Sequence, residues 1–123
     1  MIEKSAVVYV EDELEVRKQI AIYLQRRVKS LHEASNGEEG LELVKQYDPE
    51  VIVTDIEMPV MNGLDMIKKI RELYDDKKKV IVITGYMDDE HHTDLADAYL
   101  YKPINLSRLV ATIEELLSKQ NKE

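Results

Sequence analysis

The stretch VIVTDIEMPVMNG, residues 51–63, decides the fold class of this 123-residue chain. Its first four residues are apolar or β-branched and suit a strand that is buried on both faces. Asp55 follows that strand directly, and Pro59 with the Asn62-Gly63 pair then predicts a turn before a helix. An unpaired carboxylate at the end of a buried strand is unfavourable. The other polar residues near Asp55 therefore decide the function.

Similar apolar runs alternate along the chain with segments of helical periodicity. The predicted strands are residues 6–10, 30–34, 51–54, 80–84 and 98–101. Apolar side chains recur at helical spacing in the segments 16–24, 41–47, 64–74, 87–96 and 106–117. This (βα)5 alternation predicts an α/β fold, a doubly wound five-stranded parallel sheet with helices on both faces. In such sheets the functional crevice lies at the carboxyl ends of the strands.

The predicted helices differ in strength. The last helix has the clearest apolar stripe, and Asn105 is placed to cap its start. The segment 87–96 is charged throughout and has few apolar anchors, so we expect it to be the least stable element. Its pair His91-His92 suggests a metal site, but neighbouring residues on a helix point about 100° apart and do not converge. We therefore interpret the pair as part of a solvated polar face.

The composition, 44% hydrophobic and 34% charged, is that of a globular protein. The length predicts one domain over residues 1–123, with no output domain and a solvated tail at 118–123. The net charge of −8 opposes direct binding to nucleic acid. No cysteine is present to form a disulfide or bind a metal. No apolar run suits a signal peptide or a membrane span, so we expect a cytoplasmic protein without membrane insertion.

Polar residues follow or end four of the five predicted strands. Glu11 and Asp12 follow the first strand, Asp55 follows the third, Thr84 ends the fourth and Lys102 follows the fifth. Each one alone has an ordinary explanation as a helix cap, a turn former or a surface residue. Because the carboxyl ends of parallel strands meet at one edge, all five should converge. Their convergence favours a functional site over chance.

The chemistry of this set indicates metal-assisted phosphoryl transfer. Three crowded carboxylates repel one another, and one lysine cannot neutralise them. Mg²⁺ characteristically takes one or two carboxylates together with water and a phosphoryl oxygen, and Mn²⁺ can substitute for it. Asp55 beside such an ion is a plausible nucleophile towards phosphorus, with Lys102 and Thr84 stabilising the transferring group. The turn after Asp55 would fix the backbone carbonyl of Glu57 as a further metal ligand.

Together these residues closely resemble the response-regulator receiver domains of two-component signalling, of the stand-alone, single-domain type. The resemblance covers essentially the whole chain, and it rests on the motifs Glu11-Asp12, the stretch 55–63, Thr84-Gly85 and Lys102-Pro103. It implies the flavodoxin-like strand order 2-1-3-4-5. It also implies a regulatory domain that catalyses only its own phosphorylation and dephosphorylation, with a histidine kinase or a histidine phosphotransfer protein as the donor.

The resemblance also implies roles for single residues. Asp55 is the phosphoacceptor, and Asp12 and Asp55 bind Mg²⁺ with the Glu57 carbonyl. Many relatives carry Asp at the position of Glu11, so the negative charge is kept here on a longer side chain. Lys102 pairs with the phosphoryl group.

The remaining implied roles concern switching. Thr84 is the switch hydroxyl and Tyr99 the aromatic switch, which alters the face formed by the segment 87–96, the strand 98–101 and the last helix. That face would bind an unknown downstream protein. The side chains of Glu57 and Tyr86 lie two residues beyond the acceptor and the switch threonine, and they would tune the lifetime of the phosphorylated state.

Several alternatives stay open. The chain could be a receiver domain cut from a longer regulator or hybrid kinase, or an intermediate in a phosphorelay. More distant are a flavodoxin-like cofactor binder and a haloacid-dehalogenase-type phosphatase. The first would need a hydroxyl- and glycine-rich loop where the chain reads Glu11-Asp12-Glu13. The second would need its pair of aspartates on the first strand.

Overall fold

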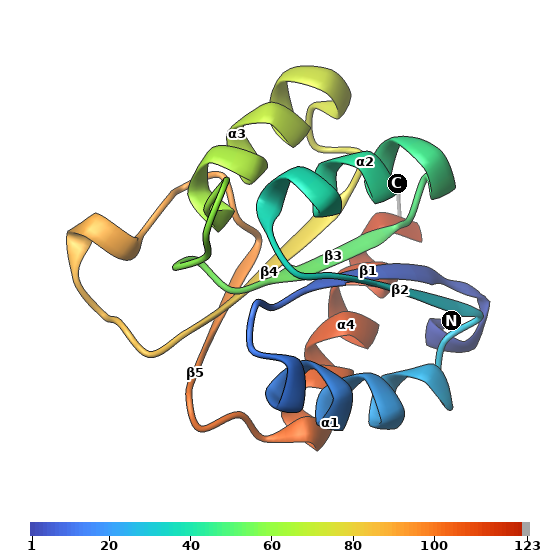
Figure 1. The fold of residues 1–123 in the computed structure, drawn as a ribbon. Coiled ribbons are helices and arrows are strands. Elements are labelled where there is room, and N and C mark those ends of the chain that lie inside the picture. Colours follow the sequence, from blue (N-terminus) through green and yellow to red (C-terminus); the bar gives the residue numbers. More distant parts are fainter. Residues whose placement is uncertain (122–123) are drawn as a thin grey trace.

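The fold is a parallel sheet between two layers of helices (Figure 1). A computed structural model describes residues 1–121. It contains five strands, all parallel, in the order β2-β1-β3-β4-β5, which confirms the predicted order. The strands are β1 (Ala6–Val10), β2 (Ser30–Ala34), β3 (Val51–Thr54), β4 (Lys79–Thr84) and β5 (Ala98–Tyr101). The α-helices are α1 (Leu14–Gln25), α2 (Gly37–Tyr47), α3 (Gly63–Tyr74) and α4 (Leu106–Asn121).

The central strands are buried on both faces because their side chains alternate between two hydrophobic cores. In β3, Val51 and Val53 face one core and Ile52 faces the other. The first core also takes the apolar side chains of α1 and α4, and the second takes those of α2 and α3. Figure 1 shows the same division, with α2 and α3 on one side of the sheet and α1 and α4 on the other. This is the doubly wound arrangement that the nearly continuous apolar strands predict.

Strand register brings the predicted site residues to one edge. Val10 of β1 pairs with Thr54 of β3, so the residues that follow them, Glu11 and Asp55, lie on neighbouring strands at the same level. On the other side, Thr84 of β4 pairs with Tyr101 of β5, which places Lys102 one residue further along. The carboxyl ends of four strands therefore meet beside β3.

Asparagine caps set the start of three helices. The side chain of Asn36 accepts a hydrogen bond from the Glu39 backbone N–H at 2.9 Å, and Asn62 accepts one from Asp65 at 2.9 Å. Asn105 accepts one from the Arg108 backbone N–H at 3.0 Å, as its position in the sequence predicts. These caps fix where the loops after β2, β3 and β5 end.

The helix predicted over residues 87–96 is wrong. Only a 3-10 turn, η2 (Asp89–His91), forms there. Met87 is 80% exposed and Leu95 41% exposed, so a helix in this segment would have little apolar surface to bury. Its backbone binds other elements instead, because the carbonyl of Leu95 accepts a hydrogen bond from Arg71 Nε on α3 at 2.9 Å.

The end of the chain differs slightly from the expected tail. Helix α4 runs to Asn121, so residues 118–121 are helical, and residues 122–123 lie outside the described part of the chain. Leu116 and Leu117 near this end are buried in the first core. Within residues 1–121, none of the helices is long and apolar enough to cross a membrane.

Candidate functional site

The three predicted carboxylates converge at the edge of the sheet. One carboxylate oxygen from each of Glu11, Asp12 and Asp55 lies within 4.8 Å of the other two. Lys102 reaches the same point from the end of β5, with its Nζ 2.7 Å from Asp55 Oδ2 and 3.6 Å from Glu11 Oε1. The structure thus brings together four of the five residues that follow or end the strands.

The backbone holds Asp55 in place. Its own N–H donates to the Val10 carbonyl at 3.1 Å, and its Oδ1 accepts from the Ile56 N–H at 2.6 Å. Gly63, at the start of α3, packs so closely that a Cβ there would lie 2.1 Å from the Asp55 carbonyl oxygen. Gly63 also donates its N–H to the Ile56 carbonyl at 2.8 Å. The two ends of the loop of residues 55–62 are therefore held together through backbone contacts between Gly63 and residues 55–56.

Glu11 is a buried acid, only 2% exposed. Burial raises its pKa from 4.5 to about 7, and the nearby charge of Asp55 acts in the same direction. A hydrogen bond from the Glu13 backbone N–H to Oε2 at 3.1 Å partly offsets this rise in the pKa. Asp12 is exposed, so the site combines one buried and one open carboxylate on the same loop.

Lys102 carries the positive charge of the site. Burial alone would lower its pKa, but the hydrogen bond to Asp55 and the charges of Asp55 and Glu11 outweigh burial and raise the pKa above its usual value. Lys102 is therefore an ammonium ion. A single positive charge between three carboxylates leaves the crevice net negative.

The donor set fits a hard divalent cation. Three carboxylates from two neighbouring loops within 4.8 Å are oxygen ligands of the kind that Mg²⁺ and Mn²⁺ accept. The backbone carbonyl of Glu57 as a further ligand stays a prediction.

The predicted switch residues lie on the two strands before Lys102: Thr84 ends β4, and Tyr99 is on β5. The Thr84 hydroxyl is fully buried and accepts a hydrogen bond from the Tyr86 backbone N–H at 3.0 Å. Tyr99 is half-buried, and its hydroxyl donates to the Thr93 carbonyl at 2.8 Å. The same hydroxyl accepts the Thr93 N–H, and the ring stacks on His92 with 4.8 Å between centroids. Both residues are thus held by the segment that follows β4.

His91 is a residue of the site region that sequence reasoning misses. Its Nε2 lies 2.7 Å from Glu57 Oε1 and its Nδ1 2.6 Å from Asp88 Oδ1, while its side chain is only 12% exposed. Its ring also stacks on that of Tyr86, with 3.9 Å between centroids. The interpretation of His91 as part of a solvated helical face is therefore wrong, because the segment is not a helix and His91 contacts Glu57 of the loop after β3.

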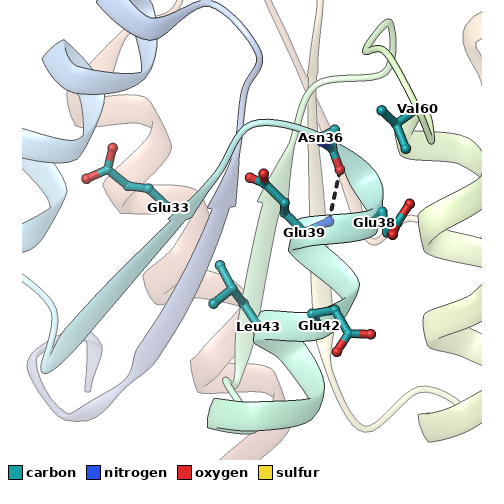
Figure 2. A pocket seen from close by; sticks show the side chains of 7 residues that line it. All are labelled: Glu33, Asn36, Glu38, Glu39, Glu42, Leu43 and Val60. Atoms are coloured by element: carbon teal, nitrogen blue, oxygen red, sulfur yellow. Dashed lines mark hydrogen bonds between the residues drawn. The ribbon is translucent and has the colours of Figure 1, made fainter.

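A separate acidic hollow of about 480 Å³ lies beside the start of α2 (Figure 2). It is lined by Glu33, Asn36, Glu38, Glu39, Glu42, Leu43 and Val60. It shares none of these residues with the Asp55 crevice. The convergence of carboxylates and lysine therefore identifies the strand ends, and not this hollow, as the candidate site.

The fold and this crevice define a class: a doubly wound α/β domain with an acidic, lysine-containing site at the carboxyl ends of its strands. The family model described as the response regulator receiver domain matches residues 7–114. The chain belongs to this family. Its domains act as regulatory phosphoacceptors in two-component systems, and they are not enzymes in the usual sense.

Curated relatives are longer proteins. The chain is 37% identical over 123 residues to the "Sensor kinase CckA" of Brucella abortus, a match that covers 95% of the chain and 13% of that relative. It is 29% identical over 117 residues to the "Transcriptional regulatory protein SrrA" of Staphylococcus aureus, a match that covers 92% of the chain and 48% of that relative. The chain thus spans about half or less of the relatives' length.

Solved structures agree with the fold. The N-terminal domain of an uncharacterized Wolinella succinogenes protein superposes with a TM-score of 0.86 at 32% identity, covering 96% of this chain and 98% of that one. A CheY-like response regulator receiver domain protein from Methanospirillum hungatei superposes with a TM-score of 0.82 at 28% identity, covering 97% and 98%. Both similarities extend over the whole domain, including the strand ends that carry the site.

Proposed function

We propose that the chain is a phosphorylation switch in which Asp55 accepts a phosphoryl group from a histidine kinase or a histidine phosphotransfer protein. The observation that carries this proposal is the convergence of Glu11, Asp12, Asp55 and Lys102 at one point of the crevice. We propose Mg²⁺ as the resident cation, held by Asp12 and Asp55 with the Glu57 carbonyl, while Glu11 adds charge. When bound, the cation neutralises the carboxylates and stabilises charge on the transferring oxygens.

The transfer involves Asp55, Lys102 and the backbone N–H of Ile56. An Asp55 oxygen forms a bond to phosphorus as the bond between phosphorus and the donor's nitrogen breaks, and the electron pair of the broken bond stays on the donor imidazole. Lys102 already lies 2.7 Å from Asp55 Oδ2, so it needs little movement to contact the incoming phosphoryl oxygens. The Ile56 N–H, bonded to Oδ1, keeps the carboxylate oriented during the reaction.

The charge added at Asp55 would drive the switch. Phosphorylation adds about 1.5 to 2 negative charges and three acceptor oxygens. The Thr84 hydroxyl then turns from the Tyr86 N–H to a phosphoryl oxygen, and Tyr99 moves into the space beside β5. This alters the face made by the segment 87–96, β5 and α4, which binds the downstream protein. Changing the ratio of active to inactive state from 1:99 to 99:1 takes about 5.5 kcal/mol. A hydrogen bond to a charged group supplies only about 1.5–3 kcal/mol. Lys102 must therefore stabilise the active state together with Thr84.

The larger protein context is proposed from the relatives. One curated relative is named a sensor kinase and another a transcriptional regulatory protein, and the chain matches only part of each. A phosphorelay step within a hybrid kinase is therefore the second candidate function. The first relative, at 37% identity, favours it. In both cases Asp55 has the same chemical role, and only the next acceptor or partner differs.

Intact mass spectrometry after incubation with acetyl phosphate tests the proposal. With Mg²⁺ present, the wild-type protein should gain the mass of one phosphoryl group, and Asp55→Asn should gain none. Asp65→Asn, an exposed aspartate on α3, is the matched control and should label like the wild type. Stoichiometric labelling of Asp55→Asn, or an unlabelled wild-type protein, would overturn the proposal.

A further inference from the structure

The loop between β1 and α1 carries two of the three carboxylates of the site, Glu11 and Asp12. Glu11 is held at the end of β1, where its N–H donates to the Ala34 carbonyl of β2 at 3.0 Å. Asp12, by contrast, is exposed and lies beyond the last paired residue of the strand. The direction of its carboxylate therefore depends on how the backbone around it is held.

Arg17 of α1 fixes the backbone on the N-terminal side of Asp12. Its Nη1 donates to the Glu11 carbonyl oxygen at 2.8 Å, and its side chain is only 14% exposed. Because a peptide group is planar, an oxygen held at Glu11 also holds the N–H and the Cα of Asp12. On the other side, the Glu13 N–H donates to Glu11 Oε2 at 3.1 Å. Both peptide groups that flank Asp12 are therefore held by hydrogen bonds.

The guanidinium of Arg17 is itself oriented by β2. Its Nε lies 3.3 Å from Glu33 Oε1, and the side chain of Glu33 is 24% exposed. A guanidinium is planar and presents its donors in a fixed fork, so the contact with Glu33 directs Nη1 at the loop. The backbone N–H of Arg17 also donates to the Glu13 carbonyl at 2.9 Å. Arg17 thus contacts both ends of the segment 11–13, which has Asp12 at its centre.

We propose that Arg17 is a positioning residue for the metal site, which holds the Glu11–Asp12 peptide group so that the Asp12 carboxylate stays close to those of Glu11 and Asp55. The inference rests on the proposed function, in which Asp12 and Asp55 bind Mg²⁺. Arg17 is not itself a ligand, because a guanidinium has no acceptor atom. It acts through the backbone, and groups that orient metal ligands commonly change metal affinity by about 10–100-fold.

Arg17 has two opposite effects on cation binding, and its neighbour Lys18 separates them. Lys18 Nζ lies 3.2 Å from the same Glu33 oxygen, and in the described part of the chain it bonds to Glu33 alone. Arg17→Met and Lys18→Met each remove one positive charge beside Glu33. Charge alone predicts tighter binding of a cation by both variants. Loss of positioning predicts weaker binding by Arg17→Met only.

The EPR signal of free Mn²⁺ measures the affinity of each protein. We expect Arg17→Met to bind Mn²⁺ about tenfold more weakly than the wild type, and Lys18→Met to bind it equally well or more tightly. Arg17→Lys keeps the charge and one donor group but lacks the fork, so its affinity should be intermediate. Equal affinities of Arg17→Met and Lys18→Met would overturn the inference. Should Arg17→Met not fold, a wild-type affinity of Arg17→Lys would overturn it instead.

Labelling by acetyl phosphate separates positioning from a general loss of structure. Arg17→Met should need a higher Mg²⁺ concentration for half-maximal labelling, and at saturating Mg²⁺ it should reach a rate close to that of the wild type. A lower maximal rate with an unchanged Mg²⁺ requirement would overturn the inference, because it would place the effect of Arg17 outside the metal site.

An NMR measurement on the metal-free protein tests the contact itself. In the presence of a chelator, the backbone amide signal of Asp12 should move in Arg17→Met, because the lost hydrogen bond lies on the same peptide group. It should stay in place in Lys18→Met. An Asp12 signal that moves equally in both variants, or in neither, would overturn the inference. A wild-type protein that binds no Mn²⁺ would instead overturn the proposed function of Asp12 and Asp55 as metal ligands.

Discussion

The ammonium group of Lys102 lies 2.7 Å from Oδ2 of Asp55, so the charge that a phosphoryl group needs is in contact with the proposed nucleophile before any donor arrives. The same Nζ lies 3.6 Å from Glu11 Oε1. Lys102 therefore has two tasks in the unphosphorylated protein. It keeps the carboxylates from repelling one another, and it prepares a site for the transferred oxygens.

These two tasks predict opposite effects for Lys102→Ala. Loss of the ammonium group should slow labelling of Asp55 by about 10²–10³-fold, the usual cost of removing one group that stabilises a transition state. It should also tighten Mg²⁺ binding, because the cation would no longer compete with a positive charge. Labelling rates and a metal titration check both, with exposed Lys69→Ala on α3 as the control. Weaker Mg²⁺ binding by Lys102→Ala would contradict this account of the site.

Glu11 should destabilise the metal-free protein at neutral and higher pH. Its folded pKa of about 7 lies above the ordinary 4.5, so folding favours the protonated form of Glu11. The wild-type protein therefore has its full stability below about pH 4.5 and loses stability as the pH rises through 7, where Glu11 ionises in the folded state. Glu11→Gln removes this dependence. In the presence of a chelator, the variant should gain about 1–3 kcal/mol over the wild type between pH 5 and pH 8. Urea unfolding measures the difference, and a gap that does not change with pH would contradict the burial argument.

Gly63→Ala should strain the loop of residues 55–62 after β3. A Cβ at this position would lie 2.1 Å from the Asp55 carbonyl oxygen, so the backbone must shift. The expected loss of stability is about 1–3 kcal/mol, the usual cost of overpacking. Gly85→Ala is the matched control, because a Cβ there would meet nothing within 4 Å. Equal unfolding midpoints for the two variants would contradict the close approach of Gly63 to the Asp55 carbonyl.

Tyr99→Phe should loosen the segment between β4 and β5. The Tyr99 hydroxyl accepts the N–H of Thr93 and donates to its carbonyl, and each such bond stabilises by about 0.5–1.5 kcal/mol. Hydrogen exchange at the Thr93 amide should therefore accelerate in the variant. Tyr101→Phe removes a hydroxyl from a 42% exposed residue on the same strand and should leave that amide unchanged. Equal exchange in both variants would argue that Tyr99 does not hold the segment.

Much of the fold follows from local patterns in the sequence. Alternating apolar runs predict four strands with their observed bounds, and β4 begins one residue earlier than predicted, at Lys79. These strands can be predicted because a nearly continuous run of β-branched apolar residues is typical of a parallel strand that is buried on both faces. The convergence of Glu11, Asp55 and Lys102 is also predictable, since the carboxyl ends of parallel strands share one edge.

The segment after β4 could not be predicted, for a physical reason. Its structure depends on partners far away in the sequence, such as Arg71 with Leu95 and Glu57 with His91. Helical periodicity reflects only residues three or four positions apart and carries no information on distant contacts. It therefore predicts a weak helix here and places His91 on a solvated face. The stacking of His91 on Tyr86 has no local signal at all.

The most direct test of the central claim is to identify the residue that carries the phosphoryl group. The protein is incubated with Mg²⁺ and acetyl phosphate, the acyl phosphate is trapped by borohydride reduction, and the peptides are sequenced by fragmentation. We expect the reduced residue at Asp55 alone, and only when Mg²⁺ is present. A reduced residue at Asp12 or elsewhere, or an equal yield in the presence of a chelator, would contradict the account.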